Sequence, residues 1–396
     1  MRVILNGVSA LKPKTGVGHT TANLHRALAE LGTGDSFWLY PGEAISGLAR
    51  RVLHRPKSSG PRRPQPGGAP RWKARFTELA KAAYRGHFRA VARWGGFDLY
   101  HEPNFVPIRT HLPTVVTVHD LSVFLYPEWH PADRVAFHER HFRRGIATAD
   151  HVIVVSEAVR REMIDVLGFP ADRVTAIHNG IGDQFRPQPP EAVEATRRKL
   201  GLPPRYFLAV GTIEPRKNIG TLLRAFCDLP AEIRASCPLV LAGGWGWKSD
   251  RERELFETEA RHRGAIHLGY VDDADLPGLY GGAAALLYPS FYEGFGLPPV
   301  EMLACGGGLI ASTAAAVREV VGGRAVLLDP HDLEGWREAM RRVAIEADYL
   351  AMTCRGGMAH ARRFTWEAAA RKTLTVYQRV LGIAEPAPEL RPSVAA

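Results

Sequence analysis

The 396-residue chain has no long apolar segment and few cysteines. None of its hydrophobic runs approaches the roughly 20 residues that a membrane-spanning helix needs. The apolar stretch at the N-terminus is also too short for a secretory signal. The cysteines all lie in the second half, at Cys227, Cys237, Cys305 and Cys354. Their spacing matches neither a metal site nor a disulfide-rich secreted domain. These absences predict a reduced, cytoplasmic setting.

Acidic residues are scarce in one part of the chain. The net charge of +10 comes from residues 1–180, which hold 25 Lys and Arg against 15 Asp and Glu, whereas the remainder balances. Residues 50–93 alone carry 13 basic residues and a single acid, Glu78. Such a concentration indicates either an anionic partner or a disordered tail.

A dinucleotide-binding fingerprint is missing as well. Gly16 and Gly18 stand between an expected strand at 3–5 and an expected helix at 20–31. No third glycine completes the pattern, and no acid follows the next expected strand at 36–40. The sequence therefore argues against an NAD site.

Strands and helices alternate in two successive series. Strands are predicted in the first half at 3–5, 36–40, 98–101, 114–119 and 151–155, and in the second half at 206–210, 239–242, 265–268, 284–288 and 325–328. Continuous apolar runs of this kind are typical of parallel strands buried on both faces. A proline-rich crossing at 183–190 joins the series, so we predict an α/β protein with two Rossmann-like domains facing across a cleft. The predicted limits are 1–185, with a basic insertion at about 47–94, then 186–365, and an amphipathic final helix and tail at 366–396.

The stretch 288–312 carries the first candidate site. Gly294 and Gly296 form a tight loop before a helix that begins near Leu297, and free N–H groups at a helix start bind anions. Glu293 in the loop and Glu301 in the helix could grip two parts of one ligand. Helix capping is the alternative, because the macrodipole favours an acid near an N-terminus.

Two adjacent cations form the second candidate site. Gly211 and Thr212 end a strand, and Arg216 and Lys217 lie in the turn before the next helix. Paired cations at such a junction suit a diphosphate. A solvent-exposed basic turn is the alternative.

His119 and Asp120 are the third candidate. They follow the strand at 114–119, at the end where open α/β sheets bind ligands. This placement is compatible with general-base chemistry, and equally with a structural histidine.

Taken together, these motifs resemble the retaining glycosyltransferases of family 4, which have the GT-B fold. The resemblance rests on P-S-x-Y-E-G-F-G-L-P followed by Glu301, on the E-x7-E spacing, on G-x-x-x-x-R-K-N and on HNGI, all in the expected order. Thr212 stands where many relatives have Arg, and 306–308 are glycines where the family usually has Thr-Pro. In this fold the final helix crosses back onto the first domain.

The resemblance implies a role for each matched residue. Arg216 and Lys217 would hold the donor diphosphate, Glu293 and His119 would contact the sugar, and Asp120 would orient His119. Glu301 would bind the nucleotide ribose. The remaining predicted donor contacts are Gly16, Gly18, Gly211, Thr212, Gly294, Phe295, Gly296 and Leu297.

The implied reaction is retaining, metal-independent transfer of a hexose, mannose from GDP-mannose, to a glycan or lipid-linked acceptor in bacterial surface polysaccharide synthesis. No cofactor or metal is expected. Asp273-Ala274-Asp275 fits the D-x-D metal pattern of another glycosyltransferase fold, but its position before a helix favours capping. The alternatives are a UDP-sugar donor, a non-catalytic nucleotide-sugar-binding protein, and, less compatible with these motifs, an epimerase or phosphorylase.

The basic segment 72–93 has the pattern of an amphipathic helix. Its apolar stripe comprises Phe76, Leu79, Ala83, Phe88 and Val91. Arg85, Arg89 and Arg93 form a basic ridge beside it, which would suit an anionic membrane surface. A core-packed helix with a solvated basic face is the alternative. Nothing else in the chain supports a nucleic-acid partner.

Overall fold

The computed structural model describes residues 1–11, 16–42, 71–346, 348–351 and 354–383. The predicted loop at 47–70 and Thr15 lie outside these residues. The chain divides into two compact units, each of which is described by itself. The first comprises Met1–Val118, Phe142–Ile153 and Ala370–Ala396, and the second comprises His119–His141 and Val154–Ala369. These units are discontinuous in the sequence and do not divide at residue 185. The predicted domain limits of 1–185, 186–365 and 366–396 stay a prediction.

Two six-stranded sheets form the framework of the protein. The first has the order β2-β1-β3-β4-β5-β6, and the second the order β12-β11-β10-β7-β8-β9. Strand pairing is parallel throughout the second sheet, and β1 pairs in parallel with β2 and β3. The strands are β1 (Arg2–Asn6), β2 (Ser36–Tyr40), β3 (Leu99–Glu102), β4 (Thr114–Val118), β5 (His151–Val154), β6 (Val174–Ala176), β7 (Phe207–Val210), β8 (Leu239–Ala242), β9 (Ile266–Gly269), β10 (Ala285–Tyr288), β11 (Leu309–Ser312) and β12 (Val326–Leu328).

The predicted strands are all present, each within about one residue of its expected ends. Two further strands, β6 and β11, were not predicted. Both are short apolar runs, and periodicity cannot distinguish such runs from parts of neighbouring helices. The α/β prediction is confirmed.

Helices connect the strands. The longer ones are α2 (Gly16–Glu30), α4 (Arg71–Trp94), α6 (Ala132–Ile146), α7 (Glu157–Asp165), α8 (Pro190–Leu200), α9 (Ile219–Cys227), α13 (Leu297–Ala304), α15 (Leu333–Ile345) and α17 (Trp366–Val380). The shorter ones are α1 (Val8–Leu11), α5 (Ser122–Leu125), α10 (Ala231–Ser236), α11 (Asp250–Leu255), α12 (Leu276–Gly282), α14 (Ala315–Val321) and α16 (Gly357–Ala361). Single turns are η1 (Pro127–Trp129), η2 (Ala171–Arg173), η3 (Pro215–Lys217), η4 (Phe256–Ala260) and η5 (Arg261–Arg263).

The start of α2 corrects the predicted loop through Gly18. The helix begins at Gly16, and the Oγ1 atoms of Thr20 and Thr21 donate to the carbonyls of Gly16 and Val17 at 3.0 and 2.9 Å. Threonine hydroxyls that bond to the carbonyl four residues earlier are compatible with a helix, and glycine does not stop one at its first turn.

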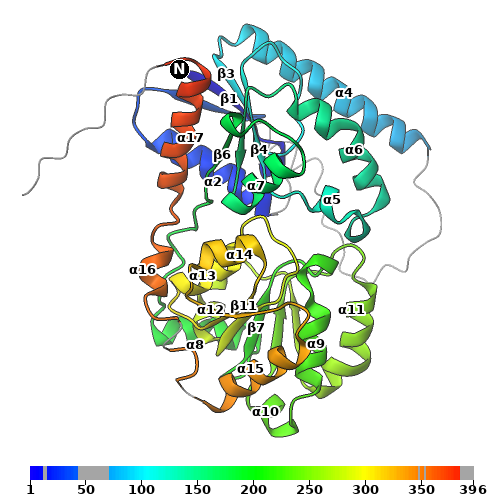
Figure 1. The fold of residues 1–396 in the computed structure, drawn as a ribbon, viewed down its shortest axis with the longest axis vertical. Helices are drawn as coiled ribbons and strands as arrows, with labels where there is room; N and C mark the ends of the chain where they lie inside the picture. The colour runs from blue at the N-terminus through cyan, green and yellow to red at the C-terminus, as the bar shows by residue number, and fades with distance from the viewer. Residues whose placement is uncertain (12–15, 43–70, 347, 352–353, 384–396) are drawn as a thin grey trace, which may run out of the picture. The chain divides into compact units, whose positions relative to one another are not determined.

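The second unit buries apolar side chains on both faces of its sheet. Leu208 and Leu286 lie in one buried cluster, whereas their neighbours Phe207 and Leu287 lie in another. Successive strand side chains point to opposite faces, so this alternation requires helices on both sides. Residues of α13 and α14 belong to the first cluster, and residues of α9 and α15, which lie side by side in Figure 1, belong to the second.

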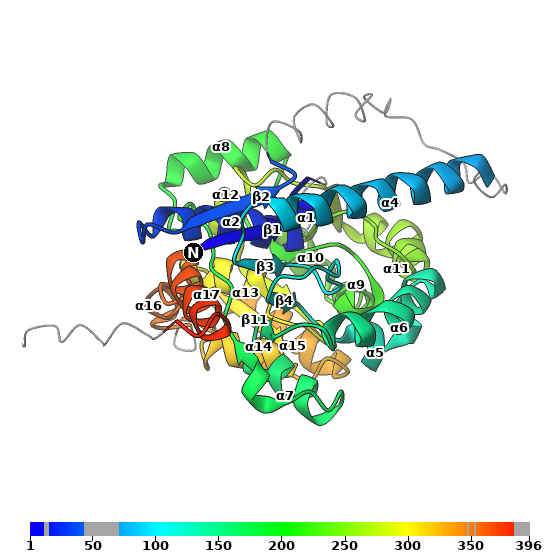
Figure 2. The ribbon, with the colours of Figure 1, turned by 90° about the horizontal axis from the view of Figure 1, so that it is seen from above.

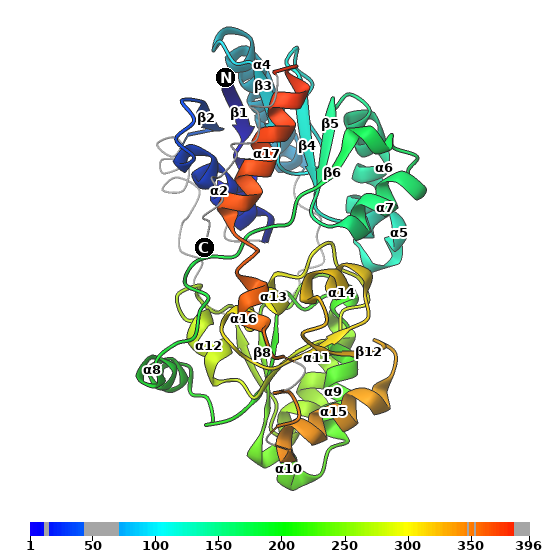
Figure 3. The same cartoon turned by 60° about the vertical axis from the view of Figure 1, so that its left-hand side comes forward.

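The final helix returns to the first unit, as the resemblance predicted. On α17 the buried Tyr377 hydrogen-bonds through its OH to Nδ1 of His101 at 2.6 Å. Its ring centroid is 6.5 Å from that of Phe37 on β2. Figure 3 shows α17 alongside the strands of the first sheet.

The C-terminal part of α4 packs on the first sheet. Phe88 and Ala92 are buried in a cluster with Ile4 and Tyr100, whereas Leu79 is 69% exposed. Figure 2 shows the helix continuing away from β1 and β3 beyond this contact. Within the described side chains, the predicted apolar stripe is buried at Phe88 and exposed at Leu79, and the side chain of Phe76 lies outside the described part. Within the described residues, no helix is both long and apolar enough to cross a membrane.

Candidate active site

The loops after β7 and β8 meet through their backbones in the second unit. The N–H of Gly211 donates to the carbonyl of Ala242 at 2.9 Å. Gly243 has a φ of +145°, and a Cβ atom there would overlap the carbonyl oxygen of Gly211. Only glycine fits this approach. The contact fixes the loop that carries Thr212 and leads to the two cations.

A compact charged cluster occupies this end of the sheet. Glu293 accepts from Nη1 of Arg216 at 2.6 Å with one oxygen and from Nζ of Lys217 at 2.5 Å with the other. Nε of Arg216 lies 2.6 Å from Oε1 of Glu214. The side chains of Glu293, Lys217 and Arg216 are 6%, 13% and 18% exposed. The structure thus brings together three residues that the sequence assigned to two separate motifs.

Burial and charge act in opposite directions on these groups. Burial alone would raise the pKa of Glu293, but Arg216 and Lys217 outweigh it and bring the pKa down to about 2. Burial lowers the pKa of Lys217, against the opposing effect of Glu293. Glu293 is therefore an ionised acceptor throughout the physiological range.

Asn218 holds the turn that carries the cations. Its φ is +54°, a conformation that asparagine adopts more readily than most residues. Its Nδ2 donates to the carbonyls of Pro289 and Pro330 at 3.1 and 2.7 Å. The Asn of the R-K-N motif thus anchors η3 to the segment before Glu293.

Glu301 lies deeper in α13 and is not a capping residue. The helix begins after Gly296, whose φ is +100°, and Oε2 of Glu301 accepts from the OH of Tyr280 at 2.7 Å. Burial raises the pKa of Glu301 to about 7. Since Glu293 is held by Arg216 and Lys217, capping accounts for neither acid. Phe295 and Leu297 flank Gly296 at the start of this helix.

His119 belongs to the second unit and packs against the same loop. A Cβ atom on Gly294 would overlap the carbonyl oxygen of His119, so glycine permits the contact. The OH of Tyr292 accepts from the N–H of Leu121 at 3.0 Å and donates to Glu162 at 2.6 Å. The His119 segment is thereby tied to the loop of Glu293.

Asp120 braces this segment. Its Oδ1 accepts from the N–H and Oγ of Ser122 at 2.9 and 2.7 Å. Ser122 Oγ in turn lies 3.0 Å from Nε2 of His130. These bonds hold the start of α5; the orienting role toward His119 stays a prediction.

Two predicted donor residues lie in the other unit. Gly16 and Gly18 form the first turn of α2 in the first unit. Their place beside the donor stays a prediction.

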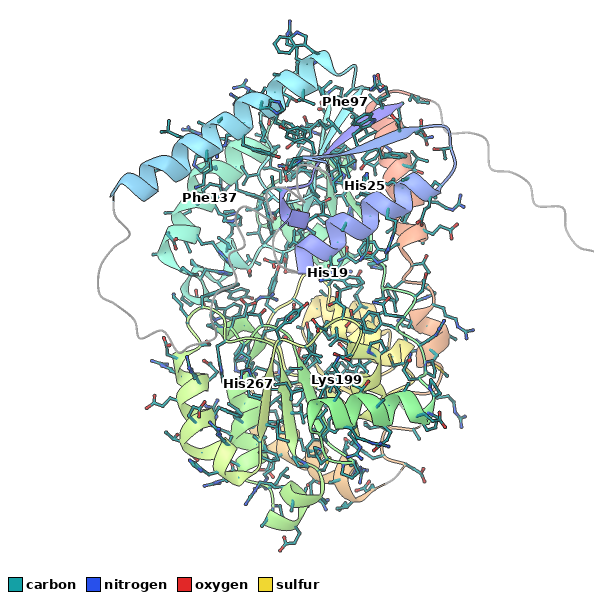
Figure 4. The ribbon with its side chains drawn as sticks, turned by 180° about the vertical axis from the view of Figure 1, so that it is seen from behind. His19, His25, Phe97, Phe137, Lys199 and His267 are labelled. Carbon is teal, nitrogen blue, oxygen red and sulfur yellow. The ribbon has the colours of Figure 1, made fainter. Side chains whose placement is uncertain are left out.

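The D-x-D segment corrects the capping prediction. Asp275 precedes α12, but its side chain makes no capping bond. Both its oxygens accept instead from Nζ of Lys199 on α8, at 2.9 and 2.8 Å; Figure 4 labels this lysine. The ion pair with Lys199 therefore takes the place of a capping bond from Asp275 to the N–H groups at the start of α12. In the described residues, no group of three or more His, Cys, Asp or Glu side chains could hold a metal ion.

Glu214 belongs to the cluster although no role was predicted for it. This residue is 2% exposed, and its Oε2 has no hydrogen-bond partner among the described residues. Burial raises its pKa, against the effect of Arg216. The sequence offered one signal for this residue: Glu214 lies in the same G-x-x-x-x-R-K-N motif as Arg216 and Lys217.

Comparisons with known proteins give the class. The family model Glycosyltransferase Family 4 matches residues 14–185, and the model Glycosyl transferases group 1 matches residues 193–352. The chain is 32% identical over 383 residues to O-antigen chain mannosyltransferase B of Escherichia coli, covering 96% of this chain and 100% of the relative. It is 30% identical to the serotype-specific mannosyltransferase WbdA of Escherichia coli, covering 68% of this chain and 34% of that protein.

Solved structures share the fold. Sucrose-phosphate synthase from Thermosynechococcus elongatus superimposes with a TM-score of 0.72 at 21% identity, covering 97% of this chain and 100% of that chain. WaaG, a glycosyltransferase involved in lipopolysaccharide biosynthesis, superimposes with a TM-score of 0.68 at 14% identity, covering 95% of this chain and 99% of that chain.

The chain belongs to glycosyltransferase family 4 and has the GT-B fold. It is a glycosyltransferase, as the motifs predicted.

Proposed function

We propose that this enzyme transfers mannose from GDP-mannose, with retention of configuration, to a glycan or lipid-linked acceptor in bacterial surface polysaccharide synthesis. The observation that carries the proposal is the cluster of Glu293, Arg216 and Lys217 at the carboxyl end of the second sheet. The choice of mannose is supported by the names of two relatives, both of them mannosyltransferases.

The cations would stabilise the leaving group. A nucleotide diphosphate develops negative charge as the bond to the sugar breaks, and buried, pre-positioned cations stabilise such charge strongly. Arg216 offers a planar set of donors and Lys217 a compact charge, so together they suit two phosphates. The backbone N–H of Leu297 at the start of α13 would add a further donor, whereas Pro298 and Pro299 after it have no N–H.

Glu293 would position the sugar. An ionised carboxylate accepts hydrogen bonds from sugar hydroxyls, and its pKa of about 2 keeps it ionised. When the diphosphate binds, the cations would divide their hydrogen bonds between it and Glu293. We propose same-face displacement without a metal, in which the departing phosphate accepts the proton of the acceptor hydroxyl.

A membrane surface is the proposed place of action. The ridge of Arg85, Arg89 and Arg93 lies on the solvent-exposed side of α4. Juxtaposed basic residues attract anionic lipid headgroups, where a lipid-linked acceptor would lie.

The test begins with calorimetric binding of GDP, UDP and ADP, followed by hydrolysis of GDP-mannose without acceptor. We expect selective GDP binding and slow mannose release. Tight UDP binding would show that the donor is a UDP-sugar and not GDP-mannose, and the protein would still be a glycosyltransferase. Failure to bind any of the three would favour a non-catalytic protein.

Glu293→Gln separates binding from transfer. We expect turnover to fall about 100-fold or more, the scale of losing one well-placed transition-state contact. GDP binding should persist or tighten, because the cations lose a competing carboxylate. Glu334→Gln, which removes an exposed acid paired with Arg337, is the control and should leave both unchanged. Near-wild-type turnover of Glu293→Gln would refute its role.

A further inference from the structure

Glu214 is a buried acid to which the proposed reaction gives no role. Its side chain is 3% exposed, its Oε1 lies 2.6 Å from Nε of Arg216, and its Oε2 has no hydrogen-bond partner among the described residues. A buried carboxyl oxygen without a partner costs free energy. The contact with Arg216 is the interaction that offsets this cost.

The loop after β8 encloses Glu214. The N–H of Ile213 donates to the carbonyl of Gly244 at 2.9 Å, and the N–H of Gly246 donates to the carbonyl of Ile213 at 2.8 Å. A Cβ atom on Gly246 would lie 3.6 Å from Cβ of Glu214, so the loop lies directly against this residue. The carbonyl of Glu214 in turn accepts from the N–H of Lys217 at 2.9 Å. The backbone around Glu214 is therefore held on both sides.

Arg216 lies between two carboxyl groups. Its Nη1 donates to Oε2 of Glu293 at 2.6 Å and to the carbonyl of Tyr292 at 3.3 Å, whereas its Nε faces Glu214. Its Nη2 makes no hydrogen bond to the described residues, and its side chain is 18% exposed. The guanidinium therefore has N–H donors left for a phosphate oxygen.

We propose that Glu214 is a positioning residue that holds the guanidinium of Arg216 in place for the donor diphosphate. Glu293 is proposed to accept hydrogen bonds from the donor sugar, so its bonds to Arg216 are then shared with the ligand. Glu214 stays on Arg216, because its carboxyl group is enclosed by the loop after β8. A side chain oriented before its ligand arrives loses less conformational entropy on binding. The inference rests on the proposed function and adds a residue to it.

A direct effect of the charge of Glu214 would have the opposite sign. A negative charge beside Arg216 repels a phosphate, so removing the charge alone should tighten nucleotide binding. Removing the contact with Nε should weaken it. Glu214→Gln removes the charge and keeps an oxygen within reach of Nε, whereas Glu214→Asp keeps the charge on a side chain that is shorter by one methylene group.

The test measures the Kd of GDP by calorimetry in the full-length enzyme, together with the thermal unfolding midpoint. We expect Glu214→Ala and Glu214→Asp to raise the Kd by about ten-fold, and Glu214→Gln to stay within about three-fold of wild type. The aspartate variant keeps the test open if the alanine variant fails to fold. Glu338→Ala, which breaks the exposed ion pair with Arg341 on α15, is the control and should stay within about two-fold.

Arg216→Lys shows whether Glu214 acts through Arg216. Lysine has no Nε–H and no planar guanidinium, so in this background Glu214 has no such group to orient. Arg216→Lys should itself weaken GDP binding, and adding Glu214→Ala should then change the Kd by less than about two-fold.

Four results would overturn the positioning role. They are an unchanged or tighter Kd in Glu214→Ala, an equal loss in Glu214→Gln and Glu214→Ala, an equal loss in the Glu338→Ala control, and a full further loss from Glu214→Ala in the Arg216→Lys background.

Failure of the proposed function gives a different result. If the wild-type enzyme binds none of GDP, UDP and ADP, the donor site fails and the role of Glu214 fails with it. If it binds UDP or ADP in place of GDP, the same variants are measured with that nucleotide, because each carries a diphosphate. If the wild type binds one of them and Glu214→Ala binds it equally well, the role of Glu214 fails alone.

Discussion

Among individual residues, Glu102 is a deeply buried carboxyl group whose pKa is raised well above its ordinary value. It ends β3, is 3% exposed, and accepts from the OH of Tyr100 at 2.6 Å, Nδ2 of Asn6 at 2.7 Å and the N–H of Asn104 at 3.1 Å. Burial raises its pKa to about 7, although these hydrogen bonds favour the charged form. The folded first unit therefore holds this proton more tightly than the unfolded chain does.

This difference predicts the sign of a pH effect on stability. Because the pKa of Glu102 rises from 4.5 to about 7 on folding, its contribution makes the free energy of unfolding decrease as pH rises from about 4.5 to about 7. The contribution is at most about 3 kcal/mol. Urea unfolding of Glu102→Gln at pH 5, 6, 7 and 8 should show a shallower decrease than wild type.

Glu334→Gln, at an exposed position, should keep the wild-type slope. Part of the decrease in stability with pH should remain in Glu102→Gln, because the pKa of Glu301 is also raised to about 7. An unchanged slope in Glu102→Gln would contradict the assignment.

Among the elements, α4 combines a packed end with a solvated one. Phe88 and Ala92 anchor it to the first sheet, while Arg85, Arg89 and Arg93 recur every four residues on its exposed side. Nε of Arg89 also donates to the carbonyl of Arg109 at 3.2 Å. Phe88 and Ala92 therefore hold the helix on the sheet while the three arginines stay exposed to solvent.

Charge reversal on α4 tests the membrane proposal. Changing Arg85, Arg89 and Arg93 to Glu should abolish sedimentation with phosphatidylglycerol vesicles at low salt, since each basic residue contributes about 1 kcal/mol to such binding. The matched control changes three exposed arginines of α6, Arg140, Arg143 and Arg144, to Glu. Equal loss in both variants would show that net charge, not α4, governs binding, and unchanged sedimentation would remove the proposal.

At the level of the whole molecule, the chain ends by returning to the unit in which it began. The part of α17 from Ala370 onward belongs to the first unit, and Tyr377 is fully buried there. Its hydroxyl bonds to Nδ1 of His101, whose Nε2 lies 2.8 Å from Oγ1 of Thr117 on β4. The first unit therefore depends on α17 for part of its buried packing.

Tyr377→Ala should destabilise this unit strongly. Removing a buried aromatic ring costs about 3–5 kcal/mol, and His101 also loses a partner. Guanidinium unfolding followed by circular dichroism would measure the loss, with the exposed Arg379→Ala as control, expected within about 0.5 kcal/mol of wild type. A loss as small as that of the control would show that α17 is not needed for the stability of the first unit.

The sequence by itself determined the framework and the chemical types at the site. Its apolar runs located most strands because a parallel strand buried on both faces must be continuously apolar. Its motifs predicted a site at Arg216, Lys217, Glu293 and Glu301, because cations suit diphosphates and carboxylates accept hydrogen bonds from sugars.

Only the tertiary structure decided how these groups are paired. Glu293 bridges two cations that precede it by more than 70 residues, and Asp275 turns from its own helix to Lys199. The rings of Trp129 and Phe291, whose centroids are 6.0 Å apart, come from positions separated by an even longer stretch of chain. Such contacts depend on which strand ends meet in the folded sheet, and local sequence patterns carry no information about that.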